Sequence, residues 1–185
     1  VLWSQDNAPL DFYAYYPYSR DAIDPEAIAM GVKPDQRTVG GRNGSDWMVA
    51  TNTIGVNEGE VELLFRHVMA AVEVEIRGGD VIMPNEKLEV QMTEVCLTNS
   101  HHLGTGMFVA ENGTGTIDMW RLENATDMDS FTYRALLPAQ TLGKGIPVFR
   151  CLQDGKIYIY RGEEIILERG NRTRFVFTLK SGSEL

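Results

Sequence analysis

The sequence has few cysteines and no long apolar run. Its 185 residues include two cysteines, Cys96 and Cys151, which are too few for a fold built on disulfides. No apolar run approaches the ~20 residues that a membrane-spanning helix needs. The chain starts at Val1 without a methionine or a signal peptide. We therefore expect a mature, cleaved or trimmed segment, in which the missing signal says nothing about export.

The sequence also lacks a basic cluster. It carries 17 lysines and arginines against 26 aspartates and glutamates, a formal net charge of −9, and the basic residues are scattered. This balance argues against a nucleic-acid partner and disfavours direct adsorption to an anionic membrane. With 43% hydrophobic residues, there is enough material for a core. The two cysteines are expected to be buried thiols, and a bridge between them stays open as an alternative.

Motifs for catalysis and metal binding are missing as well. The sequence contains no GxSxG elbow, no phosphate-binding glycine loop and no HExxH. His101 and His102 are adjacent, so in an extended chain they point to opposite faces, and we expect a surface-loop pair. Asp127 and Asp129 have calcium-loop spacing without the glycine and closing glutamate of an EF-hand. The sequence therefore predicts a non-enzyme with no catalytic residue, no cofactor and no metal site.

The strongest pattern that is present is the alternation of apolar residues between Val61 and Ile76. Apolar residues occupy odd positions in the first half and even positions in the second. Alternation is typical of a strand with one buried and one wet face. The change of parity at residues 68–71 requires a bulge, a bend or a passage from one sheet to another. This stretch predicts an antiparallel β-sandwich.

The rest of the chain supports the same fold class. An aromatic strand is expected at residues 10–16, ended by Pro17. Residues 19–59 are rich in glycine and proline, with a helical turn expected at 24–30 and short strands around Val39 and at 47–50. Asp154-Gly155 predicts a two-residue hairpin turn. The strands expected after residue 60 are 61–67, 71–77, 87–97, 106–110, 115–120, 131–137, 147–152, 156–160, 164–168 and 173–180.

Several of these segments, in this order, resemble the fimbrillin-like family of Bacteroidetes surface proteins. The first are LDFYAYYPY at residues 10–18, PDQ at 34–36 and SDWMVA at 45–50. VELLFRHVMAAVEVEI at 61–76 and ALLPAQTL at 135–142 follow, and KIYIY and RFVFTL resemble the closing hairpin of the family. The resemblance spans nearly the whole chain.

The resemblance implies an all-β protein made of Greek-key, transthyretin-like sandwiches. Residues 1–56 would be the closing part of an N-terminal sandwich plus a long loop, and residues 57–185 the C-terminal sandwich. It further implies an exported lipoprotein at the cell surface and outer membrane. Its function would be that of a structural or adhesive subunit of a pilus or fimbria, whose partners are other subunits bound by β-strand exchange. Contact with the membrane would be through a lipid anchor absent from this chain.

The resemblance transfers no catalytic residue but indicates candidates for strand exchange or core packing. These are Phe12, Tyr13, Tyr15 and Tyr16 in the first sandwich, and Phe65 and His67 in the second. On strand parity alone, His67 is expected to be a core histidine. The tyrosines also fit an aromatic carbohydrate platform, so a module that binds a surface glycan or a host protein is the alternative function. A third hypothesis, a hydrolase with carboxylates on distant strands, predicts a cleft carboxyl with a raised pKa.

Overall fold

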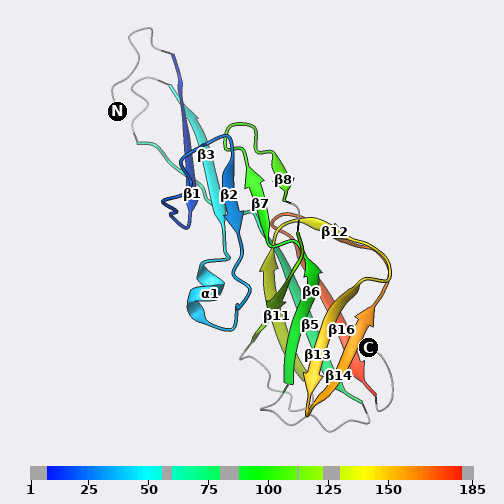
Figure 1. The fold of residues 1–185 in the computed structure, drawn as a ribbon. Coiled ribbons are helices and arrows are strands. Elements are labelled where there is room, and N and C mark those ends of the chain that lie inside the picture. The colour runs from blue at the N-terminus through cyan, green and yellow to red at the C-terminus, as the bar shows by residue number, and fades with distance from the viewer. Residues whose placement is uncertain (1–7, 56–59, 80–87, 112, 123–129, 181–185) are drawn as a thin grey trace.

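A computed structural model describes residues 8–55, 60–79, 88–111, 113–122 and 130–180. Within them the chain is almost entirely β-structure (Figure 1), which confirms the predicted fold class. The elements are β1 (Leu10–Tyr16), β2 (Ile28–Gly31), α1 (Val39–Asn43), β3 (Met48–Ile54), β4 (Arg66–His67), β5 (Ala70–Gly78), β6 (Leu88–Val95), β7 (Thr98–His101), β8 (Phe108–Ala110), β9 (Gly115–Asp118), β10 (Trp120–Arg121), β11 (Ser130–Leu137), β12 (Gln140–Leu142), β13 (Pro147–Gln153), β14 (Lys156–Arg161), β15 (Ile165–Leu167) and β16 (Arg172–Leu179).

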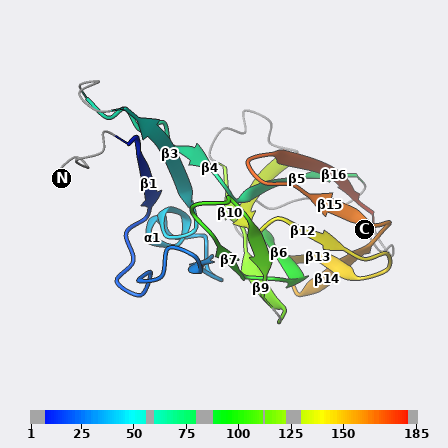
Figure 2. The ribbon, with the colours of Figure 1, turned by 90° about the horizontal axis from the view of Figure 1, so that it is seen from above.

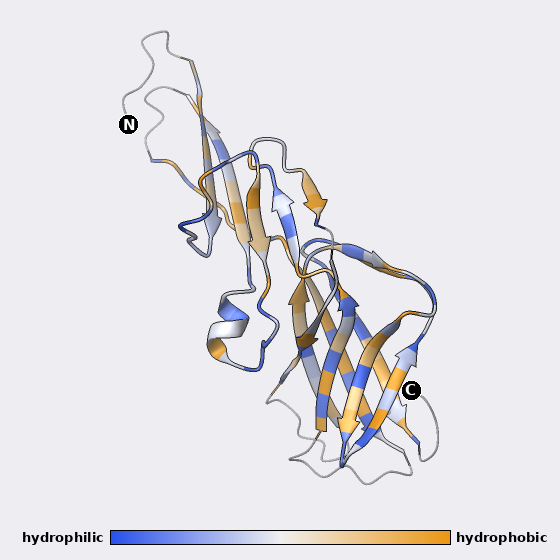
Figure 3. Cartoon of the chain, viewed as in Figure 1, coloured by the Kyte–Doolittle hydropathy of each residue, from blue (hydrophilic) through white to orange (hydrophobic). Residues whose placement is uncertain are grey.

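Two four-stranded sheets pack against each other as a sandwich, with strand orders β10-β11-β5-β16 and β14-β13-β6-β9 (Figure 2). Hydrophobic and polar residues alternate along their strands (Figure 3), as a two-layer structure requires. The pairings are antiparallel with one exception, because β16 runs parallel to β5. The largest fully buried apolar side chains of these two sheets are Phe149, Ile76, Met92, Ile117, Leu137 and Leu179.

Two smaller sheets lie toward the N-terminal end of the molecule (Figure 1), with orders β1-β3-β4 and β2-β7-β8. The second of them joins distant parts of the sequence, because β2 at residues 28–31 pairs with β7 at 98–101. The two-stranded sheet β12-β15 completes the described topology. Strands from before and after residue 57 therefore share the sheet β2-β7-β8. The division of the chain into domains at residues 1–56 and 57–185 stays a prediction.

The change of parity at residues 68–71 is a passage between sheets. His67 ends β4, which pairs with β3, and Ala70 begins β5 in the sandwich. Val68 and Met69 between them are buried, and the Val68 N–H donates to the Trp47 carbonyl at 3.0 Å. One of the three explanations predicted for this stretch is therefore confirmed.

Residues 34–36 attach the N-terminal segment to the sandwich. The Asp118 N–H donates to the Pro34 carbonyl at 2.8 Å, and the Gln36 N–H donates to the Asp118 carbonyl at 3.1 Å. The Gln36 side chain is fully buried. Its Nε2 donates to the Leu136 carbonyl at 2.7 Å, and its Oε1 accepts from the Leu136 N–H at 2.8 Å. β10 is only two residues long and pairs with Tyr133 and Arg134 of β11. The side-chain amide of Gln36 bonds to the backbone of Leu136, the next β11 position that would need a strand partner.

Two local predictions in the N-terminal segment are wrong. No helical turn follows Asp24; its Oδ1 accepts from the Glu26 N–H at 2.9 Å in a turn that leads into β2. Val39 begins the helix α1 and not a strand, and Thr38 caps that helix by accepting from the Gly41 N–H at 3.0 Å. Gly41 is required there, because a Cβ would lie 1.9 Å from the Asp35 carbonyl oxygen.

The predictions after residue 60 differ in outcome. The strand expected over residues 61–67 is reduced to the two residues of β4, and β7 and β12 were not predicted. His101, expected in a surface loop, is buried in β7 with its ring 4.1 Å from that of Phe108. Burial lowers the pKa of His101. The hairpin turn at Asp154-Gly155 is confirmed, with positive φ angles of 47° and 79°.

Both cysteines are free thiols. Cys151 is buried in β13, and that burial raises its pKa to about 12. Cys96 is half-buried, and its Sγ lies 3.0 Å from the Thr98 carbonyl and 3.1 Å from the Glu111 carbonyl. The expectation of a buried thiol therefore holds fully for Cys151 and partly for Cys96.

Candidate functional site

One side of the sandwich, bordered by β14 and β16, is incompletely covered. Both strands lie at the ends of their sheets in the described part of the chain. Tyr160, Phe175 and Phe177 line this β14–β16 side and are half-buried, whereas Phe149 beneath them is fully buried. The Tyr160 ring lies 4.8 Å from that of Phe177, and the Phe149 ring lies 4.9 Å from that of Phe175. Aromatic side chains at two sheet edges thus form a surface on which a further strand can pack.

The predicted aromatic strand, β1, is also at an edge, paired within the described residues with β3 alone. Phe12 and Tyr15 are half-buried, and Tyr15 stacks on Trp47 with ring centroids 6.3 Å apart. Tyr13 and Tyr16 are 43% and 44% exposed. Because side chains alternate along a strand, Phe12 and Tyr16 share one face and Tyr13 and Tyr15 the other, so each face carries one half-buried and one exposed aromatic side chain. Whether these residues exchange with a neighbour stays a prediction.

Phe65 and His67 lie outside the core, so the expectation of core packing is wrong for them, and a part in strand exchange stays a prediction. Phe65 is 40% exposed, and the His67 side chain is 61% exposed. The reason is that β4 pairs with β3 outside the two sandwich sheets, so the alternation of side chains along it does not direct Phe65 and His67 into the second core. His67 Nδ1 lies 2.7 Å from Asp46 Oδ1. The register aligns Tyr16 with Met48 and Met48 with His67, so the aromatic strand and β4 lie in one sheet.

The outer face of β5, expected to be wet, is covered by arginines from its own sheet. Glu73 and Glu75 are both buried. Glu73 is paired with Arg134 of β11 and lies 3.5 Å from Arg172 of β16. Glu75 is paired with Arg77 of its own strand, at 2.6 Å, and with Arg174 of β16. These ion pairs connect β11, β5 and β16 across the outer face.

Replacing Glu75 by glutamine is expected to reduce the acid sensitivity of folding. Hydrogen bonding from Arg77, and then from Arg174, holds the pKa of Glu75 below its ordinary value of 4.5. The unfolded chain therefore binds this proton first as the pH falls, so the stability from the carboxylate is complete above about pH 4.5 and is lost below it. Urea unfolding between pH 7 and pH 3 should show a smaller decline for Glu75→Gln than for the unmodified protein. Parallel curves for the two proteins would contradict this account.

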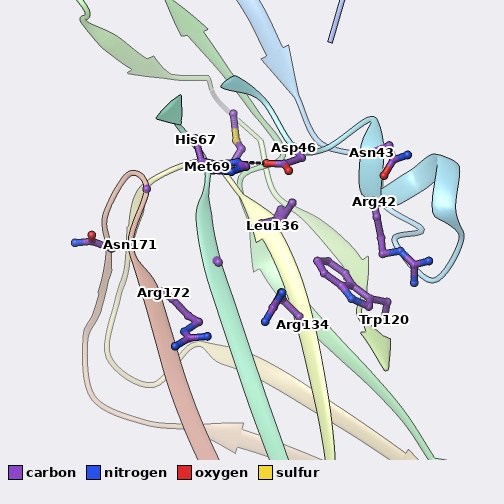
Figure 4. Close-up of a pocket in the computed structure, with 12 residues that line it drawn as sticks. Arg42, Asn43, Asp46, His67, Met69, Trp120, Arg134, Leu136, Asn171 and Arg172 are labelled. Carbon is purple, nitrogen blue, oxygen red and sulfur yellow. Dashed lines mark hydrogen bonds and ion pairs between the residues drawn. The ribbon is translucent and has the colours of Figure 1, made fainter. Parts of the chain in front are cut away.

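A hollow of about 530 Å³ lies between α1 and the outer face of the sheet β10-β11-β5-β16. We call it the basic hollow. Figure 4 shows His67 and Asp46 on one side of it and Trp120, Arg134 and Arg172 on the other, with Leu136 between. Arg42 reaches it from α1, and its guanidinium carbon lies 5.9 Å from the centre of the Trp120 ring. Arg134 lies at the same distance from that ring.

Of the six predicted site residues, only His67 lines the basic hollow. The other lining residues were not predicted, because α1, β5, β10, β11, the start of β16 and the connections between strands each contribute only one or a few of them. In the sequence alone, nothing distinguishes each of these arginines from an ordinary surface charge. The alternation of Arg172 and Arg174 with Phe175 and Phe177 marks one polar face of β16, but a sequence does not show which strands lie beside it.

The shifted carboxyls do not resemble those of a hydrolase. Asp35 and Glu75 both have lowered pKa values, and the first cause in each case is a hydrogen bond from an arginine, Arg37 for Asp35 and Arg77 for Glu75. A general acid in a cleft requires a raised pKa. Within the described residues, no group of three or more His, Cys, Asp or Glu side chains could hold a metal ion. Also within that part of the chain, no helix has the length and apolarity for crossing a membrane.

Three solved structures share this fold. The candidate cell adhesion protein of Bacteroides ovatus has a TM-score of 0.74 at 19% identity, over 95% of this chain and 64% of that one. The corresponding protein of Bacteroides uniformis has a TM-score of 0.69 at 16% identity, over 98% and 72%. That of Bacteroides thetaiotaomicron has a TM-score of 0.61 at 14% identity, over 96% and 68%. The chain thus spans 64% of the first of these structures, and identities this low show the fold alone.

No curated protein matches the chain. The sequence profile described as fimbrillin-like, however, matches residues 1–185, the whole chain. That match agrees with the resemblance seen in the sequence, with the two-sheet sandwich, and with the solved structures of the same fold. The chain belongs to the fimbrillin-like family.

Proposed function

We propose that this protein is a structural or adhesive subunit of a cell-surface pilus, assembled by exchange of a β-strand between subunits. The observation that carries the proposal is the β14–β16 side, where Tyr160, Phe175 and Phe177 remain half-buried between two edge strands. A strand from a neighbouring subunit would pair with an open edge and cover these rings. Main-chain hydrogen bonds and apolar contacts then form together, which makes dissociation slow.

The cellular setting is part of the same proposal. Membership in the fimbrillin-like family and the likeness to cell adhesion structures support an exported protein at the cell surface or outer membrane. A lipid anchor carried outside this chain would connect it to the membrane. We also propose that residues 1–56 close an N-terminal sandwich and residues 57–185 form the C-terminal one, with the β7–β8 hairpin reaching back to pair with β2.

A charge placed on the inner face of β16 is expected to block strand exchange. Phe177 points toward Tyr160 and Phe149, so Phe177→Lys puts an ammonium group where the incoming strand would pack. Association of subunits, followed by sedimentation velocity over a range of concentrations, should weaken about tenfold or more. The lysine stem can reach solvent from this half-buried position, so circular dichroism should still show a folded sandwich.

The matched control is Val176→Lys, one residue earlier on the same strand. Val176 is 46% exposed and points to the outer face, so the added charge does not enter the β14–β16 side. This variant should associate as the unmodified protein does. Equal loss in both variants would point to net charge and not to strand packing. A strictly monomeric unmodified protein would refute strand exchange at this side.

A further inference from the structure

The basic hollow concentrates positive charge in an acidic protein. The net charge of the chain is −9, yet three arginines, Arg42, Arg134 and Arg172, line this one opening. Two carboxylates offset them in part: Glu73 is shared by Arg134 and Arg172, and Asp46 is paired with His67. Because one glutamate serves two guanidinium groups, the arginines keep a surplus of positive charge. The hollow therefore attracts an anion.

Arg42 is available to that anion. In the part of the chain that the structure describes, it forms no ion pair, and its guanidinium carbon lies 5.9 Å from the centre of the Trp120 ring. The Arg172 side chain is 65% exposed, and its distance of 3.5 Å from Glu73 is long for an ion pair. Two guanidinium groups on different elements thus reach the hollow with free N–H donors. Guanidinium groups bind carboxylates through pairs of parallel hydrogen bonds.

The remaining lining fits a ring that carries hydroxyls. Met69 and Leu136 provide an apolar floor, and Asn43, Asp46 and Asn171 provide amide and carboxylate groups at the rim. Amides both donate and accept hydrogen bonds, as neighbouring hydroxyls require. A volume of about 530 Å³ lies within the range of small-ligand sites. An apolar floor with a few polar groups is the usual composition of such sites.

An extended peptide fits less well, because β11 and β5 in the middle of the hollow are paired on both sides. Arg134 pairs with Trp120 on one side and with Glu73 on the other, and Ala71 pairs with both Leu136 and Arg172. Peptides that bind sheets usually do so by adding a strand to an unpaired edge. Recognition at this hollow therefore has to come from side chains, which favours a compact anionic ligand.

We propose that the basic hollow binds a carboxylate-bearing sugar, such as a uronic acid unit of an anionic polysaccharide. Arg42 and Arg172 supply the positive charge and the N–H donors for the carboxylate. The asparagine and aspartate side chains at the rim bind hydroxyls, and the floor of Met69 and Leu136 packs against the sugar ring. This site lies apart from the β14–β16 side, so it can act in an assembled pilus as well as in a single subunit.

The test is titration calorimetry of the chain with four probes at low salt: glucuronic acid, glucose, acetate and a hexaglutamate peptide. Glucuronic acid should give saturable binding, glucose none, and acetate and the peptide weaker binding than glucuronic acid. Arg42→Gln and Arg172→Gln should each weaken glucuronic acid binding about tenfold or more, because each removes a charge-assisted contact. Thermal melting of both variants checks that the fold is intact.

Arg161→Gln is the matched control. Arg161 is an exposed arginine of β14 outside the hollow, so its loss changes the net charge equally and should leave glucuronic acid binding unchanged. Equal weakening by all three variants would overturn the proposal in favour of general attraction by charge. Acetate binding as tight as that of glucuronic acid would reduce the hollow to an anion site. Tighter binding of hexaglutamate would assign it to an acidic protein instead.

Discussion

Replacing Gln36 by alanine is expected to lower the free energy of unfolding by about 2–5 kcal/mol. The side-chain amide satisfies both the N–H and the carbonyl of Leu136, at 2.8 and 2.7 Å. Alanine leaves these two part-buried backbone groups without partners, and each costs about 1–3 kcal/mol when water does not reach it. Urea unfolding followed by tryptophan fluorescence, with Trp47 and Trp120 as probes, measures the loss.

Gln91→Ala is the matched control for Gln36. Gln91 is half-buried on β6, and its Nε2 donates to Asp118 Oδ1 at 2.7 Å. It binds other side chains and no strand backbone, so its removal should cost about 1 kcal/mol or less. If Gln36→Ala were no more destabilising than Gln91→Ala, water would be reaching Leu136, and a structural role for the Gln36 amide at the end of β11 would be refuted.

Replacing Phe149 by alanine is expected to cost about 3–5 kcal/mol. Phe149 is fully buried in β13, and its ring lies 4.9 Å from Phe175, 5.5 Å from Phe177 and 6.0 Å from Tyr160. The half-buried rings above it cannot fill the space without leaving their own edge strands, so a cavity remains. Chemical denaturation at neutral pH gives the difference directly.

Phe149→Leu separates the cavity from the aromatic contacts. Leucine keeps most of the buried apolar volume and should cost less than half as much as alanine. Because the rings of the β14–β16 side rest on Phe149, the alanine variant should also associate less tightly with a neighbouring subunit than the leucine variant. Equal costs for the two substitutions would show that packing volume at this position is unimportant.

Local chemistry was enough to predict the elements whose determinants lie close together in the sequence. β1 matches its predicted bounds because six of its seven residues are apolar or aromatic and Pro17 ends the strand. The turn at Asp154-Gly155 follows because both residues tolerate positive φ angles. In both cases the information lies within a few residues of the element that forms.

Elements that depend on a distant partner were missed. Residues 24–30 carry a helix-start signal, yet Ile28 to Gly31 become β2 because β7, some seventy residues later in the chain, pairs with them. The parity of His67 suggested burial, but parity gives the face of a strand and not the sheet that the strand joins. The basic hollow is a stronger case, since its three arginines come from α1, β11 and β16. Tertiary placement overrides local preference at each of these sites.

The parallel pairing of β16 with β5 restricts when the protein can fold. β5 lies at the centre of its sheet, but one of its neighbours is the last described strand, and the ion pair of Arg174 with Glu75 joins positions 99 residues apart. During synthesis, β5 is made long before the strand that covers its edge. Contacts of such long range also form slowly. The sandwich therefore closes in a late step of folding, after its last described strand has been made.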